Sequence, residues 1–242
     1  MIAALALVLL AQAEPALPGA ALSAALRAVQ KDGPIALAPE VQADLVALLP
    51  AARRGEECPG KAKLSGEAQA LKDRGDGAVL VAALDTCKGA RVFAFAPGAP
   101  TRVARLLDEA GAVRSLKALN LRGGKHEDDL GLELATSPTS SELRLFNHRG
   151  AGFAFSEAGA LRDFASVREC AAGTGEGSGW SSFVRVGKAG LEVLRTDASC
   201  GGAPWQASCL LWTLEQDALS RSGVCALPAR LDARALRASG WR

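Results

Sequence analysis

The pattern of apolar and polar residues divides the chain into a helical start and a longer part that is rich in strands. Near the start, apolar side chains recur every three or four positions, which is typical of amphipathic helices. The first helix is expected over Ala20–Lys31, before a Gly-Pro turn. The second begins at Pro39, which suits a first helical turn, and ends at Pro50. The pattern therefore predicts two N-terminal helices that pack on a larger body.

From about residue 67 the apolar period changes to two, and short apolar runs alternate with clusters of Gly, Pro, Asp and Ser. This pattern predicts three successive groups of four strands, which begin near residues 69, 115 and 162 and so repeat every 46 or 47 residues. The expected strands are 68–71, 79–84, 90–96, 101–107, 116–121, 130–135, 142–146, 152–156, 163–169, 182–186, 191–195 and 208–214. Two flanking segments, 35–37 and 224–227, offer further short strands.

A repeat of this length is typical of propeller blades, each of which is a four-stranded antiparallel meander. Propellers need about four to eight blades to close, so a β-sandwich or barrel remains an alternative. The expected fold class is mainly β: repeated four-stranded antiparallel meanders, propeller-like or a β-sandwich/barrel, with two N-terminal helices. The expected divisions are a signal peptide at 1–13, a helical N-terminal segment at 14–56, a β-rich domain of three four-stranded units at 57–229 and a basic C-terminal tail at 230–242.

One stretch of the strand-rich part has a strand, an acidic glycine loop and a second apolar strand, over Lys117–Leu132. It resembles the FG-GAP/VCBS-type β-propeller repeat, and Leu71–Leu80 is a poorer second copy, so the resemblance covers residues 68–156 at most. The resemblance implies Ca²⁺ ligands at Asp76, Asn120 and Asp128. Basic residues occupy other ligand positions of these loops, where their charge opposes a metal. We therefore expect ordinary polar turns and no cofactor, with Ca²⁺ as the alternative.

The first residues predict export. An apolar run, Ile2–Leu10, precedes Ala11-Gln12-Ala13, a cleavage site of the small-x-small type. The run is too short to span a bilayer, which needs roughly 20 apolar residues. No later stretch is long and apolar enough to do so, and we expect a periplasmic or secreted protein with no transmembrane segment.

Six cysteines agree with this location, because an even count in an exported chain predicts disulfides. The chain has no CxxC motif, and both histidines lie far in the sequence from any cysteine, which argues against zinc. In an up-down meander, the loops after the first and third strands lie at the same end of the sheet. This topology predicts the pairs Cys58–Cys87, Cys170–Cys200 and Cys209–Cys225.

The candidate catalytic chemistry is sparse. His126 lies beside Glu127 and Asp128, and a histidine with carboxylates can act as a general acid or base. An envelope hydrolase is therefore the alternative function, but no nucleophile motif accompanies these residues, and we assign no catalytic residue. The net charge of +2, from 28 basic and 26 acidic residues, argues against a nucleic-acid partner.

Two tryptophans provide the better candidate site. Trp180 follows one glycine-rich loop and Trp205 follows another, and the expected topology places both loops at one end of the third group of strands. Tryptophans held there would form a platform for a protein or carbohydrate partner, or they would cap the core. We predict an exported, disulfide-stabilised binding or scaffold module without catalytic activity.

Overall fold

The computed structural model confirms a mainly β chain with few helices. The residues described below are 20–32, 35–36, 38–48, 65–72, 78–86, 89–96, 102–109, 111–122, 128–148, 155–167, 178–199 and 204–242. Both expected N-terminal helices are present, as α1 (Ala20–Asp32) and α2 (Pro39–Ala47). Within these described ranges, no helix has the length and apolar character needed to cross a membrane.

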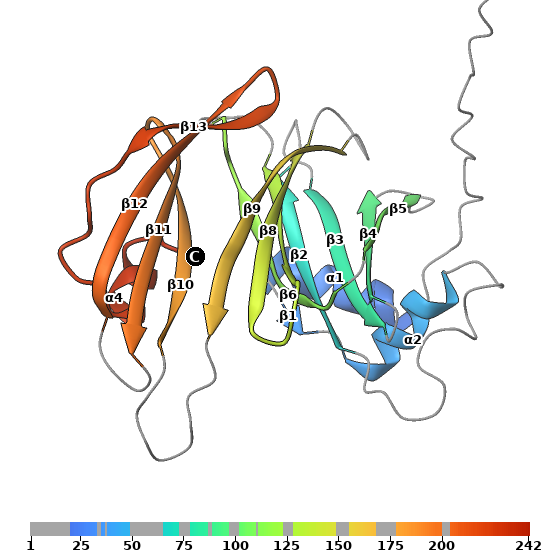
Figure 1. The fold of residues 1–242 in the computed structure, drawn as a ribbon. Helices are drawn as coiled ribbons and strands as arrows, with labels where there is room; N and C mark the ends of the chain where they lie inside the picture. The colour runs from blue at the N-terminus through green and yellow to red at the C-terminus, as the bar shows by residue number, and fades with distance from the viewer. Residues whose placement is uncertain are drawn as a thin grey trace, which may run out of the picture.

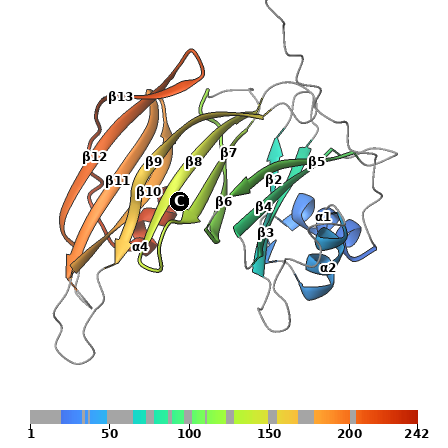
Figure 2. The same cartoon turned by 45° about the vertical axis from the view of Figure 1, so that its right-hand side comes forward.

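The strands form two antiparallel sheets, and in each sheet they follow one another in chain order (Figures 1 and 2). The five-stranded sheet contains β1 (Ile35–Ala36), β2 (Ser65–Lys72), β3 (Ala78–Thr86), β4 (Gly89–Ala96) and β5 (Arg102–Glu109). The eight-stranded sheet contains β6 (Val113–Leu119), β7 (Asp129–Ala135), β8 (Ser140–His148), β9 (Phe155–Val167), β10 (Ser178–Gly187), β11 (Gly190–Ser199), β12 (Pro204–Glu215) and β13 (Ala218–Val224). The eight-stranded sheet is therefore a continuous meander, and β2 to β5 form a second one, whereas α2 lies between β1 and β2 in the chain.

The strands are grouped as five and eight, which differs from the three groups of four expected from the sequence. The cause is β9, a single strand of 13 residues where two strands, 152–156 and 163–169, were expected. It joins the second and third expected groups into one sheet. Its pairing with β8 contains register shifts, which interrupt the alternation that a regular strand would show. The segment 35–37 contains β1, whereas β13 ends where the segment 224–227 begins.

The five-stranded sheet is buried on both faces, which explains the nearly continuous apolar runs of β3 and β4. One face packs against α1 and α2, in a core formed by Leu22, Val41, Leu45, Ala82, Leu84, Phe93 and Phe95. The other face packs against β6 and β7, in a core formed by Val79, Val81, Ala83, Ala90, Val92, Ala94, Leu116, Leu130, Leu132 and Leu134. The arrangement is a layer of helices, a sheet and a second sheet, visible in Figure 1.

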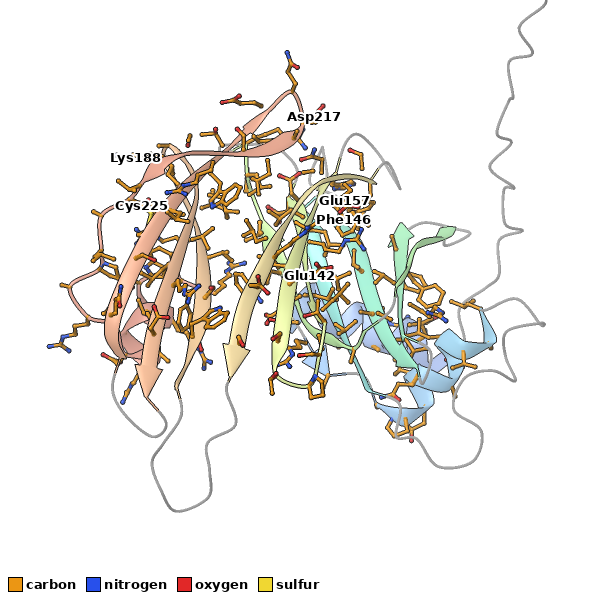
Figure 3. The ribbon with its side chains drawn as sticks, viewed as in Figure 1. Glu142, Phe146, Glu157, Lys188, Asp217 and Cys225 are labelled. Carbon is orange, nitrogen blue, oxygen red and sulfur yellow. A yellow bond between two sulfur atoms is a disulfide. The ribbon has the colours of Figure 1, made fainter. Side chains whose placement is uncertain are left out.

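The eight-stranded sheet curls, so that its C-terminal strands share a third core with β6, β8 and β9 (Figure 2). The tip of the β12–β13 hairpin reaches back to β8, where Asn147 Nδ2 donates to the Asp217 carbonyl at 2.9 Å. Figure 3 shows Asp217 at this tip. Gly159, at φ +151°, permits the approach, because a Cβ there would lie 3.3 Å from the Leu219 Cβ. The hairpin therefore covers β9 as well as pairing in its own sheet.

One predicted disulfide lies among the described residues and is confirmed. Cys209 and Cys225 are bonded, with their Cα atoms 5.1 Å apart, and neither of these two cysteines is free. The Cys225 N–H also donates to the Cys209 carbonyl at 3.1 Å. The bond ties the segment after β13 to β12. The partners of the predicted pairs Cys58–Cys87 and Cys170–Cys200 lie outside the described residues.

The C-terminal segment packs against the outer side of β10 and β11. A short helix, α4 (Ala233–Ala238), begins at Asp232, whose side chain accepts from the Ala235 N–H at 2.8 Å. It ends with two backbone hydrogen bonds, Trp241 N to Leu236 O at 3.0 Å and Gly240 N to Arg237 O at 3.1 Å. This is a Schellman ending, which requires a left-handed residue at position 240. Gly240 has φ +86° and directs the Trp241 side chain into a core with Leu236.

We predict that Gly240→Ala lowers the free energy of unfolding by about 1–2 kcal/mol, because an alanine at this φ is strained. Gly223→Ala is the matched control, since a Cβ at Gly223 meets no atom within 4 Å and its φ is ordinary. Urea denaturation of both variants checks the prediction. Equal effects of the two substitutions would show that the left-handed ending does not fix the C-terminal segment.

Candidate functional site

The structure describes some of the residues that the sequence singled out and omits others. Trp180 lies on β10 and is half-buried. The backbone of Trp205 belongs to β12, but its side chain lies outside the described residues, as do Asp76, His126 and Glu127. Asn120 and Asp128 are described, and both line one pocket. Two places therefore remain as candidate sites: the surface around Trp180 and this pocket.

Around Trp180, polar side chains replace apolar ones on one face of the curled sheet. The strand register places Trp180 opposite Asp197, and Asp197 opposite Gln206. One step along the same face, Ser182 lies opposite Arg195, and Arg195 opposite Ser208. Further along the same face lie Val184 and Val193, which belong to the third core. We call the six residues of these first two rows the polar sheet face: Trp180, Ser182, Arg195, Asp197, Gln206 and Ser208.

The Trp180 ring is held by its neighbours. Its Nε1–H donates to the Asp163 carbonyl at 2.9 Å. The Arg195 guanidinium lies over the ring, 4.1 Å from its centroid, and is itself held by Asp197 through an N–O distance of 3.0 Å. Stacking of this kind is favourable because the cation faces the electron-rich side of the indole. The result is an oriented aromatic ring bordered by hydrogen-bonding groups, as the binding-platform interpretation of Trp180 requires.

The pocket lies between β6 and β10 and has a volume of about 390 Å³. Apolar side chains of both strands line it, together with Asn120, Asp128, Arg185 and Arg242. Arg242 Nη1 donates to the Ala118 carbonyl at 2.6 Å. Arg185 pairs with Glu192 at 2.5 Å and lies 4.5 Å from the centroid of the Trp241 ring.

Asn120 and Asp128 thus come together, as the calcium interpretation requires, but in the company of arginines. A guanidinium competes with a cation for the same carboxylate and repels Ca²⁺. Across the described part of the chain, no group of three or more His, Cys, Asp or Glu side chains is placed to hold a metal. The residues of this pocket do not fit a Ca²⁺ site.

The burial of Asp129, the carboxylate next to Asp128 in the cluster beside His126, is one feature that the sequence analysis missed. Asp129 is fully buried, and its carboxylate accepts from the backbone N–H groups of Leu121 and His148, both at 3.1 Å. Arg122 Nη2 donates to it at 3.0 Å. Burial raises the pKa of Asp129, although these hydrogen bonds act in the opposite direction. The role is structural: one side chain joins the ends of β6, β7 and β8 beside the pocket.

A second missed cluster crosses β6, β7 and β8. Glu133 accepts from Lys117 Nζ at 3.0 Å, from Ser115 Oγ at 3.0 Å and from Ser141 Oγ at 2.9 Å. Lys117 Nζ also donates to Ser115 Oγ. A serine beside a lysine resembles a nucleophile with its base. Here Lys117 Nζ donates to both Ser115 Oγ and Glu133, so it is a hydrogen-bond donor to the serine and is not arranged to accept the serine proton.

No protein-family model, curated protein or solved structure matches this chain. The resemblance to the FG-GAP/VCBS-type repeat therefore stays a prediction.

The Lys117–Glu133 pair predicts a pH dependence of stability. Burial of Glu133 alone would raise its pKa, but the Lys117 ammonium and the serine hydroxyls outweigh burial and lower it from the ordinary value of 4.5. A lowered folded-state pKa stabilises the fold above pH 4.5, and this contribution is lost as the pH falls through the folded-state pKa.

Glu133→Gln should lower the free energy of unfolding at pH 7 by about 2 kcal/mol, since charge-assisted hydrogen bonds are lost. The variant should also lose less stability than the wild type between pH 5 and pH 3, where Glu133 takes up a proton. Urea denaturation across this range measures both effects. Glu142→Gln is the control, because Glu142 on β8 is not part of the cluster (Figure 3). The prediction is refuted if the free energy of unfolding of Glu133→Gln falls between pH 5 and pH 3 as steeply as that of the wild type.

Proposed function

We propose that this protein is an exported, non-catalytic binding module that captures carbohydrate on its polar sheet face. The observation that supports the proposal is the fixed Trp180 ring, held by Asp163 and Arg195 within two rows of polar side chains on β10, β11 and β12. A protein partner is the alternative occupant of the same face.

The chemistry of the face suits a sugar. The C–H groups of a pyranose ring are apolar and pack on the exposed part of an indole, whereas its hydroxyls need donors and acceptors close to that ring. Arg195, Gln206 and Ser208 are exposed and supply such groups at neighbouring strand positions. Because the Trp180 ring is already oriented, binding would cost little side-chain entropy.

Export is supported by the start of the sequence and by the Cys209–Cys225 bond, since structural disulfides persist in oxidising compartments. The envelope-hydrolase alternative depends on His126 and Glu127, which lie outside the described residues. No described contact favours it over a binding module.

Export predicts a processed chain. When the full-length sequence is expressed in a bacterium with an intact secretion pathway, we expect the product in the periplasm or medium to begin at Glu14. Intact-mass measurement and N-terminal sequencing check this result. Replacing Ala11 and Ala13 by bulky residues should leave the precursor uncleaved, and an uncleaved wild-type chain confined to the cytosol would contradict the prediction.

Carbohydrate binding predicts a dependence on Trp180. Co-sedimentation with cellulose, chitin and purified peptidoglycan should identify at least one glycan that binds the wild-type protein. Trp180→Ala should weaken that binding about thirtyfold or more, the loss expected when a central aromatic contact of 2 kcal/mol is removed. Arg195→Ala should weaken it as well, because the ring then loses its stacked neighbour.

Arg221→Ala is the matched control, since Arg221 is an exposed arginine on a strand, β13, outside the polar sheet face. It should bind like the wild type. Thermal unfolding of each variant separates loss of binding from loss of fold. The carbohydrate proposal fails if the wild type binds none of the glycans, or if folded Trp180→Ala binds as well as the wild type.

A further inference from the structure

The pocket between β6 and β10 is separate from the polar sheet face and has its own architecture. The described pairing of β10 with β9 is limited to Gly179 and Trp180, so the rest of that edge of β10 leaves β9. β6 is an edge strand of the eight-stranded sheet, paired within that sheet with β7 alone. Two strand edges therefore border the pocket, and the C-terminal segment lies between them (Figure 2).

The edge of β10 already binds one piece of main chain. Val184 N–H donates to the Arg242 carbonyl and Arg242 N–H donates to the Val184 carbonyl, both at 2.9 Å. In an antiparallel strand, alternate residues direct their N–H and C=O groups to the same edge, so those of Val186 point the same way. Val186 lines the pocket, and no described residue pairs with its main chain at this edge. It therefore offers the pocket a backbone donor and acceptor.

The two arginines of the pocket differ in what they have left to bind. Arg185 is paired with Glu192 and covers Trp241. Arg242 uses Nη1 on the Ala118 carbonyl, and no carboxylate of the described ranges forms an ion pair with its guanidinium. Its remaining N–H groups suit a carboxylate ligand, which a guanidinium binds through charge-assisted hydrogen bonds.

The opposite strand edge supplies the complementary charge. Asn120 and Asp128 line the pocket from the ends of β6 and β7, and Asp128 provides a carboxylate for a cationic group. The apolar residues Leu119, Val184 and Val186 also line the pocket, and of these three Val186 is partly exposed. The volume of about 390 Å³ lies within the range of small-molecule sites.

We propose that this pocket binds a free α-amino acid with an apolar side chain. Its carboxylate binds Arg242 and the Val186 N–H, its ammonium group binds Asp128 and the Asn120 amide oxygen, and its side chain packs on Val186, which is partly exposed. The proposal does not depend on carbohydrate binding, because the polar sheet face lies at the other end of β10.

Isothermal titration with the standard L-amino acids at millimolar concentration tests the proposal. We expect an apolar amino acid, such as leucine, to bind best. Its carboxamide and its N-acetyl derivative should each bind at least tenfold more weakly, because each lacks one of the two charges. Failure of every amino acid to bind, or equal binding of the carboxamide, would overturn the proposal.

Variants then locate the site. Arg242→Gln should weaken binding of the amino acid at least tenfold, and it keeps the main-chain pairing with Val184. Arg237→Gln, an exposed arginine of α4 that does not line the pocket, should bind like the wild type. Asp128→Asn should weaken binding of the amino acid but not that of its N-acetyl derivative. Equal losses in Arg242→Gln and Arg237→Gln, or an unchanged affinity in folded Arg242→Gln, would place the ligand elsewhere and refute the proposal.

Discussion

The pairing of Arg242 with Val184 is the contact by which the C-terminal segment closes the curled sheet. Because β10 departs from β9, its edge has main-chain N–H and C=O groups without a strand partner. Burying such groups without hydrogen bonds would destabilise the fold. Arg242 satisfies two of them and reaches β6 with its side chain. The left-handed Gly240 and the buried Trp241 fix the position from which Arg242 does so. The pocket depends on this closure, because Gly240 and Arg242 line it.

Burial determines where chemistry remains on the sheets. The five-stranded sheet is covered by helices on one face and by β6 and β7 on the other, so the side chains of its central strands are mostly apolar. The eight-stranded sheet is covered along part of its length, and the same face turns from Val184 and Val193 to Trp180 and Asp197 where the cover ends. Alternate residues of one strand lie on the same face. On this face they belong to the core at one end of the strand and form a hydrogen-bonding surface at the other.

Sequence reasoning succeeded where apolar alternation reports burial directly. The strands expected at 79–84 and 90–96 correspond to β3 and β4, and the Cys209–Cys225 pair was expected because Cys225 closely follows the strand that holds Cys209. It failed where a strand is set by its turn and its pairing and shows no apolar alternation. β13 is polar and exposed, so it shows no apolar period, and its hairpin turns at Gln216 and Asp217 with φ of 49° and 69°. Left-handed turns are expected at Asn-Gly or Asp-Gly, and this turn carries neither signal.

The candidate sites show a different limit, which is the distance along the chain between residues that act together. Asn120 and Asp128 were singled out as cation ligands from their local loop, and the structure does place them in one pocket. The residue that changes their meaning is Arg242, which contacts Ala118 across 124 positions of sequence. No local pattern predicts that contact, because it arises from the Schellman ending of α4 and the free edge of β10. Asn120 and Asp128 considered alone suggest a metal site. With the Arg242 guanidinium in the same pocket, the three residues suit a zwitterion instead.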